Sequence, residues 1–329
     1  MKPRKDTSIK DIAAKSGFST ATISRVLNHQ GGYSKETENR VMNIVKELNY
    51  SIKNQNLQKI GILVPDLTNE WFAETVRCLE EELYAKNFHC YISSTNEIPS
   101  REHFCFEGLT ALKVSAIISF LGSEELVSLA ESASFPVLFI DRIPQAPGKF
   151  LCLESDNYIG GYMATELLIQ KGCKKILFIG RNHHASVIHS RQKGYQDALK
   201  EYQLPINPEL MLQLESPDHP YERSRDLVCY AIKKKIEFDG IFASSDLRAS
   251  GALQALKQNG FSVPEQIKII GFDDTSVCRQ CYPALSSVRQ DPLAMARHTI
   301  ELLFWQLTQN PHLAKHMVLP VSIVERGTT

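Results

Sequence analysis

Carboxylates, amides and arginines recur directly after short apolar runs in the part of the chain that follows residue 59. They are Asp66, Asn69, Asp141, Arg142, Arg181, Ser244, Ser245, Asp246, Asp273 and Asp274, with Trp71 and Phe72 beside the first pair. Acids accept hydrogen bonds from hydroxyls, a guanidinium donates in a fixed fork, and an aromatic face covers the apolar side of a sugar ring. The pattern favours a site for a polyhydroxylated ligand, although any single acid is also compatible with helix capping.

A second group of polar residues lies near the N-terminus, on a predicted helix from Thr20 to about Leu27 that Ser19 caps. Its apolar residues fall on one face, which leaves Thr20, Ala21 and Arg25 outward. Such a helix enters the major groove of DNA, where an arginine pairs with a guanine and an alanine contacts a thymine methyl. Ser19, Thr22 and Asn28 suit phosphate contacts. The alternative is a three-helix packing module with a solvated basic face.

The charge distribution supports the nucleic-acid interpretation. The chain has no net charge, with 37 basic and 37 acidic residues, but residues 1–59 hold eleven Lys and Arg against five Asp and Glu. The remaining residues hold 26 against 32. A basic head on an acidic body predicts one module that faces a polyanion.

Enzyme and metal chemistry find little support in the sequence. Cys278 and Cys281 form a C-x-x-C without a second ligand pair, and Asp273-Asp274 has no nucleophile motif or phosphate-binding loop nearby. We therefore expect no enzyme activity, no cofactor and no metal. The eight scattered cysteines suit free thiols in a reducing compartment. No apolar run approaches the roughly 20 residues of a membrane span. The polar N-terminus lacks a secretory leader, so we expect a cytoplasmic protein.

The elements that must position these residues follow from hydrophobic periodicity. Residues 1–50 predict three short helices, the first of which ends before Gly17, in a helix-turn-helix plan, and 51–58 indicate a linker. Seven strands are predicted, at Ile60–Val64, His89–Ser93, Ala116–Phe120, Val137–Ile140, Lys175–Ile179, Gly240–Ala243 and Lys268–Ile270. Helical stretches between them include Trp71–Lys86, Tyr158–Gln170, Ser190–Tyr202, Asp246–Asn259 and Leu293–Gln309. This alternation predicts parallel sheets covered by helices on both faces. Residues 59–329 are too many for one such sheet, so we expect two doubly wound lobes.

The chain resembles the lactose-repressor/galactose-repressor family of bacterial transcription regulators over nearly its whole length. The matching segments, in order, are Thr7–Ala13, Ser19–Asn28, Tyr33–Thr37, Val64–Asn69, Trp71–Glu74, Ile140–Arg142, Asp156–Asn157, Gly194–Tyr195, Gly271–Asp274, Val288–Gln290 and Val324–Thr328. The resemblance implies a periplasmic-binding-protein-like body, whose two lobes we expect to divide near 156–161, as the length of 59–329 suggests, and again near 288–291. It implies a homodimer that binds near-palindromic operator DNA, most simply a repressor of carbohydrate-use genes controlled by a sugar or sugar phosphate.

The resemblance also implies which residues form the two sites. Those implied to contact DNA are Thr7, Ser19, Thr20, Ala21, Thr22, Arg25, Asn28 and Leu57. Those implied to bind the effector are Asn69, Trp71, Phe72, Asp141, Arg142, Arg191, Asp246, Asp273 and Gln290. Two alternatives stay open: a regulator of the same family that responds to a purine or nucleoside, and, in a different class, a sugar-binding transport receptor.

The segment 51–58 departs from the family pattern. Similar proteins carry a hinge that begins with proline and asparagine and whose leucine wedges into the minor groove. Here the hinge is shorter by several residues and has no such proline. Leu57 is the candidate wedge, because kinking needs only an apolar side chain at the right place. An ordinary linker leucine is the competing interpretation.

Overall fold

The computed structural model describes residues 9–27, 31–48, 59–145, 149–181, 186–214, 219–308 and 314–329. The chain divides into two compact units, Met1–Gln58 and Lys59–Thr329. None of the described helices combines the length and hydrophobicity that a membrane span requires.

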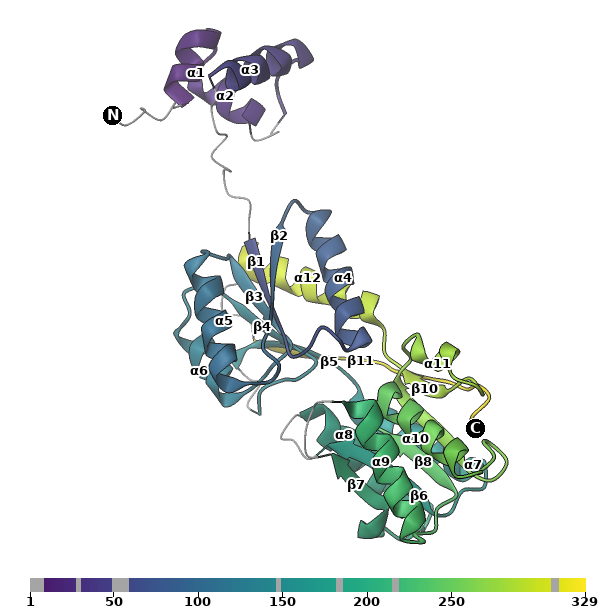
Figure 1. The fold of residues 1–329 in the computed structure, drawn as a ribbon. Coiled ribbons are helices and arrows are strands. Elements are labelled where there is room, and N and C mark those ends of the chain that lie inside the picture. The colour runs from purple at the N-terminus through teal and green to yellow at the C-terminus, as the bar shows by residue number, and fades with distance from the viewer. Residues whose placement is uncertain are drawn as a thin grey trace, which may run out of the picture. The chain divides into compact units, whose positions relative to one another are not determined.

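The first unit is a bundle of three helices, α1 (Ile9–Ser16), α2 (Thr20–Leu27) and α3 (Lys35–Glu47) (Figure 1). Gly17 ends α1 with a φ of 79°, which a residue without a Cβ adopts at no steric cost. Ser19 caps α2 by accepting from Thr22 N at 3.1 Å, and Ser34 caps α3 in the same way. Ile12, Ile23, Val26, Val41 and other apolar side chains are buried between the helices. The predicted helix-turn-helix head is confirmed.

The described part of the second unit contains two six-stranded sheets. The first holds β1 (Lys59–Val64), β2 (His89–Ser94), β3 (Ala116–Ser119), β4 (Val137–Ile140), β5 (Leu151–Ser155) and β11 (Lys315–Leu319) in the order β11-β5-β4-β3-β1-β2. The second holds β6 (Ile176–Arg181), β7 (Met211–Leu214), β8 (Gly240–Ala243), β9 (Lys268–Asp273), β10 (Ser286–Arg289) and β12 (Ser322–Val324) in the order β12-β10-β9-β8-β6-β7. Every described pairing is parallel except β10 with β12.

Helices cover both faces of each sheet because alternate side chains of a strand point to opposite sides. On the first sheet, Ile62 packs in a cluster with α4 (Glu70–Tyr84) and α12 (Pro292–Thr308), and its neighbour Leu63 packs with α5 (Pro99–Ala111) and α6 (Glu124–Ser132). On the second, α9 (Pro220–Lys233) and α10 (Asp246–Gln258) cover one face, and α7 (Asn157–Gln170) and α8 (Ser186–Glu201) cover the other. The short α11 (Val277–Gln280) follows β9. The predicted α/β body of two doubly wound lobes is confirmed.

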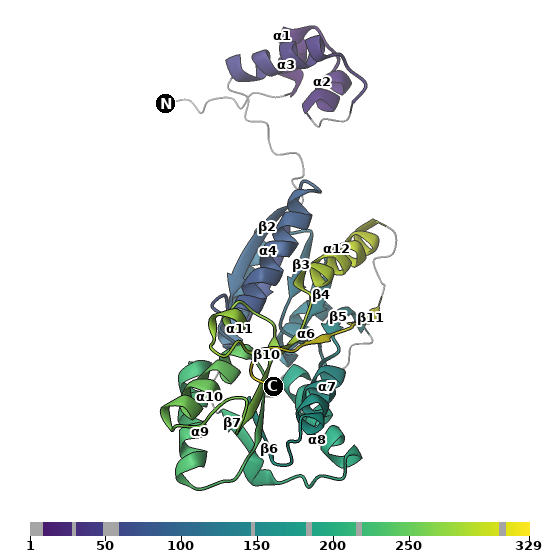
Figure 2. The same cartoon turned by 90° about the vertical axis from the view of Figure 1, so that its right-hand side faces the viewer.

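The chain passes from one sheet to the other at three places, after β5, after β10 and after β11 (Figure 2). We call the first sheet with its helices the first lobe (59–155 and 292–319) and the second sheet with its helices the second lobe (157–289 and 322–329). The passage at 319–322 was not expected. The sequence does not predict this passage because β11 and β12 are edge strands, and exposed residues such as Lys315 interrupt the apolar pattern that marks a strand.

Candidate functional site

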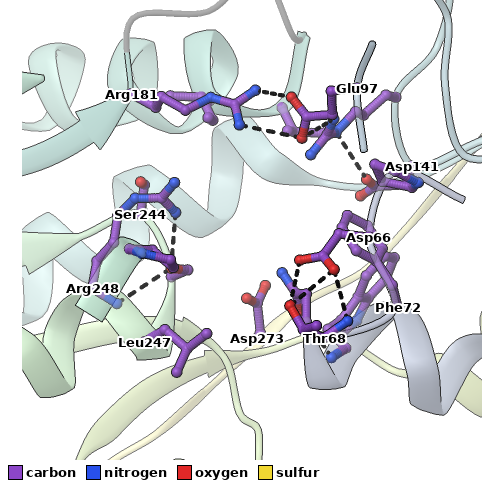
Figure 3. A pocket seen from close by; sticks show the side chains of 18 of the residues that line it. Asp66, Thr68, Phe72, Glu97, Asp141, Arg181, Ser244, Leu247, Arg248 and Asp273 are labelled. Atoms are coloured by element: carbon purple, nitrogen blue, oxygen red, sulfur yellow. Dashed lines mark hydrogen bonds and ion pairs between the residues drawn. The ribbon is translucent and has the colours of Figure 1, made fainter. Parts of the chain in front are cut away.

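The polar residues that end the strands of both lobes line one cavity of about 510 Å³ (Figure 3). Parallel strands of an open α/β sheet end at a common edge, which is where ligands bind in such folds. Eight of the nine residues implied to bind an effector line this cavity, namely Asn69, Trp71, Phe72, Asp141, Arg142, Arg191, Asp273 and Gln290. Asp66, Arg181, Ser244 and Ser245 also line it.

Asp246 is the exception, since it does not line the cavity. Its side chain is 1% exposed, and its carboxylate accepts from Thr275 N at 2.7 Å, Thr275 Oγ1 at 3.0 Å and Ser287 Oγ at 2.6 Å. Ser245 caps α10, so Asp246 at the first helical position turns toward β9 and β10 instead. It ties α10 to the sheet behind the cavity wall.

Arg191 is held rigidly at the centre of the second lobe's wall. Its Nε donates to Asn157 Oδ1 at 2.8 Å, and its Nη1 donates to the Ser244 carbonyl at 2.7 Å and lies 3.6 Å from Asp273 Oδ1. The guanidinium also stacks 3.5 Å above the ring of Phe272. With these contacts around the group, its orientation is fixed before any ligand arrives.

Two buried carboxylates face the cavity from opposite lobes, Asp141 after β4 and Asp273 at the end of β9. Burial raises the pKa of Asp141 to about 7, although Arg142 and Arg191 oppose the shift. Burial also raises the pKa of Asp273, against Arg191 and the 2.7 Å hydrogen bond from Gln290 Nε2. Both acids accept hydrogen bonds from a ligand in their ionised form, and the raised pKa of Asp141 places its ionisation near neutral pH.

Glu97, in the loop between β2 and α5, joins the two lobes. Its carboxylate lies 2.8 Å from Arg142 Nη1 of the first lobe and is bidentate to Arg181 of the second (Figure 3). Burial favours a raised pKa, but the two arginines outweigh it and lower the pKa of Glu97 to about 2. Sequence reasoning missed this residue because no polar residue was singled out after the predicted strand at His89–Ser93.

Trp71 and Phe72 supply the apolar part of the wall. They are 3% and 6% exposed and pack edge to face with each other and with Phe120. The indole Nε1 of Trp71 is buried and has no acceptor in the described part of the chain. Arg142 lies over the ring of Phe72 at 5.5 Å.

In the first unit, α2 presents Thr20, Ala21 and Arg25 to solvent, as a base-reading face requires. Ser19 and Thr22 bond to each other through their hydroxyls at 2.9 Å at the start of the helix. Thr7, Asn28 and Leu57, together with the linker 51–58, lie outside the described residues.

A helix-turn-helix unit joined to a two-lobed body with a polar cavity at its strand ends is the architecture expected of a ligand-responsive, DNA-binding regulator. Residues 8–52 match the model of the bacterial regulatory proteins of the lacI family, and 165–329 match that of a periplasmic binding protein-like domain.

The chain is 30% identical to the sucrose operon repressor of Pediococcus pentosaceus, over 100% of both chains. It is 30% identical to the transcriptional repressor PurR of Haemophilus influenzae, over 91% of both. A solved periplasmic binding protein/LacI transcriptional regulator from Alkaliphilus metalliredigens, complexed with D-xylulofuranose, matches 83% of this chain and 99% of its own at 28% identity, with a TM-score of 0.72.

The protein belongs to the lacI family of bacterial regulatory proteins. It is therefore a DNA-binding transcriptional regulator that acts on operator DNA, and the alternative of a transport receptor falls away. Its family is one of transcriptional repressors rather than of enzymes.

Proposed function

We propose that the cavity binds a carbohydrate effector that controls operator binding. The observation that carries this proposal is the convergence of hydroxyl acceptors, fixed guanidinium donors and buried aromatic rings, from both lobes, on one cavity. Its volume of about 510 Å³ suits a small sugar. The sugar ligand of the regulator from Alkaliphilus metalliredigens supports the same ligand class.

Asp141 and Arg142 of the first lobe and Arg191 and Asp273 of the second contact one ligand in this proposal. A ligand held by both lobes favours the arrangement that satisfies both sets of contacts, which is how binding shifts a two-lobed body between states. A coupling of about 1–3 kcal/mol changes operator affinity by roughly 5- to 150-fold.

Operator binding is proposed to use α2 in the major groove, with Arg25 bidentate to a guanine and Thr20 and Ala21 at base edges. Ser19 and Thr22 contact phosphates at the helix start. A homodimer places two such helices on half-sites about one helical turn apart in a near-palindromic operator. The target is operator DNA, and all eight cysteines are free thiols, so we place the protein in the cytoplasm.

The test separates the two sites with two variants of the full-length protein. Arg25→Ala is expected to abolish binding to a duplex selected from a random library, and to leave thermal stabilisation by sugars intact. Asp273→Asn is expected to bind the duplex normally but lose the sugar response, while keeping an acceptor for Gln290. Loss of both properties in either variant contradicts the two-site proposal. Stabilisation of the wild type by purines or nucleosides alone favours the purine alternative.

A further inference from the structure

Arg248 in the first turn of α10 is a cavity-lining cation without a counter-ion. Its Nη1 donates to Ser245 Oγ at 2.9 Å, and its buried Nε has no acceptor in the described part of the chain. Among the described residues, no Asp or Glu oxygen lies within 4.0 Å of its guanidinium. In Figure 3 it lies on the wall opposite Glu97 and Asp141, with open space between them.

The other three arginines of the cavity are each paired with an acid. Arg142 and Arg181 share Glu97, and Arg191 lies 3.6 Å from Asp273. Within the described residues, every guanidinium that lines the cavity thus has a carboxylate within 4.0 Å, except that of Arg248, which is half-buried.

The surroundings of Arg248 make its charge costly. Burial, with the nearby charge of Arg181, lowers its pKa to about 10. Asp273 opposes the shift, and Arg191 and Arg142 add to it. A buried cation without a partner is unfavourable unless something supplies the missing negative charge.

Ser244 gives an independent indication at the same place. Its side chain is 2% exposed and lines the cavity, and its hydroxyl has no partner in the described part of the chain. The N-terminus of α10, a helix of 13 residues, begins two positions later, and its dipole favours negative charge. A hydroxyl donor, a guanidinium and a helix N-terminus together suit a tetrahedral or planar oxyanion.

We propose that the effector is an anionic carbohydrate, whose phosphate or carboxylate group binds Arg248 and Ser244. The inference rests on the proposed carbohydrate function and narrows its ligand class. A neutral sugar offers hydroxyl acceptors to the guanidinium but brings no charge, so it leaves the cation uncompensated.

The experiment compares each of two neutral sugars with its charged derivatives. Thermal melts and calorimetry on the full-length protein use D-glucose, glucose 6-phosphate and D-glucuronate, then D-ribose and ribose 5-phosphate, with inorganic phosphate alone. An anionic member is expected to bind more tightly than its neutral parent, and the phosphate and carboxylate arms identify the group. Arg248→Met is expected to weaken that binding by about 10- to 100-fold. The control Arg225→Met removes a second-lobe arginine that pairs with its neighbour Asp226 and does not line the cavity, so it leaves binding unchanged.

Equal binding of a neutral sugar and its charged derivative, or unchanged affinity in Arg248→Met, overturns the inference and leaves the carbohydrate function standing. Stabilisation by inorganic phosphate alone, with none by any of the sugars or their derivatives, counts against the carbohydrate function instead. If no probe binds, the ligand-free melts decide about Arg248. A Tm of Arg248→Met at or above the wild type supports an uncompensated cation, and a Tm several degrees lower shows that Arg248 serves folding.

Discussion

Gly161 fixes how closely α7 and α8 approach, and with it the position of Arg191. A Cβ added at Gly161 would lie 2.2 Å from the carbonyl oxygen of Arg191 and 2.8 Å from its carbonyl carbon and Cα. Gly194 makes the reciprocal approach, since a Cβ added there would lie only 2.1 Å from the carbonyl oxygen of Tyr158. These are backbone atoms, so no rotamer change relieves the contact and the helices must separate.

The size of the effect of Gly161→Ala follows from two opposing contributions. Overpacking of this kind costs about 1–3 kcal/mol, with the upper end expected for a backbone contact. Alanine gains about 1 kcal/mol over glycine inside a helix. The net loss of about 2 kcal/mol corresponds to a Tm lower by roughly 4–8 °C for a body of this size. Because the separation moves Arg191 away from Ser244 and Asn157, effector affinity is expected to fall about tenfold or more.

Gly108→Ala is the matched control, since Gly108 also lies inside a helix, α5, but has nothing within 4 Å of an added Cβ. The same chemical change is expected to raise the Tm of the body by about 2–4 °C. Circular dichroism and calorimetry on the full-length protein measure both variants. A Gly161→Ala variant as stable as Gly108→Ala, with normal effector binding, would refute the argument that this helix contact positions Arg191.

Two further predictions concern the charged groups of the cavity. Glu97→Gln leaves Arg142 and Arg181 without their carboxylate, so urea titration at pH 7 should show a loss of about 3–5 kcal/mol. Because the pKa of Glu97 is lowered from 4.5 to about 2, this contribution is complete above about pH 4.5 and disappears toward pH 2. A constant difference across that range contradicts the assignment. The raised pKa of Asp141, about 7, makes ionisation disfavour folding as the pH rises from about 4 to 7. Effector affinity should nevertheless increase from pH 6 to 8, because only the ionised carboxylate of Asp141 accepts hydrogen bonds from ligand hydroxyls with both oxygens. Asp141→Asn should remove this pH dependence of effector affinity, which calorimetry measures.

The helix-turn-helix head was predictable because its signals are local. Gly17 ends one helix and Ser19 and Ser34 begin the next two within a few residues of the chain. The strands that were predicted are mostly those buried on both faces, such as β1 and β8. Strands β7, β11 and β12 lie at sheet edges and carry exposed or half-buried residues, so their apolar pattern is too weak to recognise. The interior strands β5 and β10 were also missed, because Glu154 in β5 and the serines and arginine of β10 interrupt the apolar run.

The cavity was predictable at the level of strand ends but not at the level of helix rotation. Asp141 and Asp273 lie at the ends of parallel strands, and the topology brings such positions together whatever the details. Asp246 and Arg248 differ by two positions, which on a helix is a rotation of about 200°. The cap at Ser245 sets which of them faces the ligand, and it turns Asp246 into the sheet and Arg248 into the cavity. Sequence alone does not give that rotation.

Backbone conformation gives a separate reason to regard this cavity as functional. Left-handed residues other than glycine include Asn87, Lys113, Gln203 and Lys235, each just after a helix, where this conformation commonly ends helices. A second set lies away from helix C-termini and lines the cavity: Asn96, Glu97, Asp141, His219 and Asp273. Asp274 also has a positive φ but does not line the cavity. Glycine would relieve the strain at each of these, yet three of the five carry carboxylates. Each of these conformations costs of order 1–3 kcal/mol. The ion pairs of Glu97 with Arg142 and Arg181 offset that cost within the fold, whereas the proposed ligand recognition accounts for the carboxylates of Asp141 and Asp273 at the cavity.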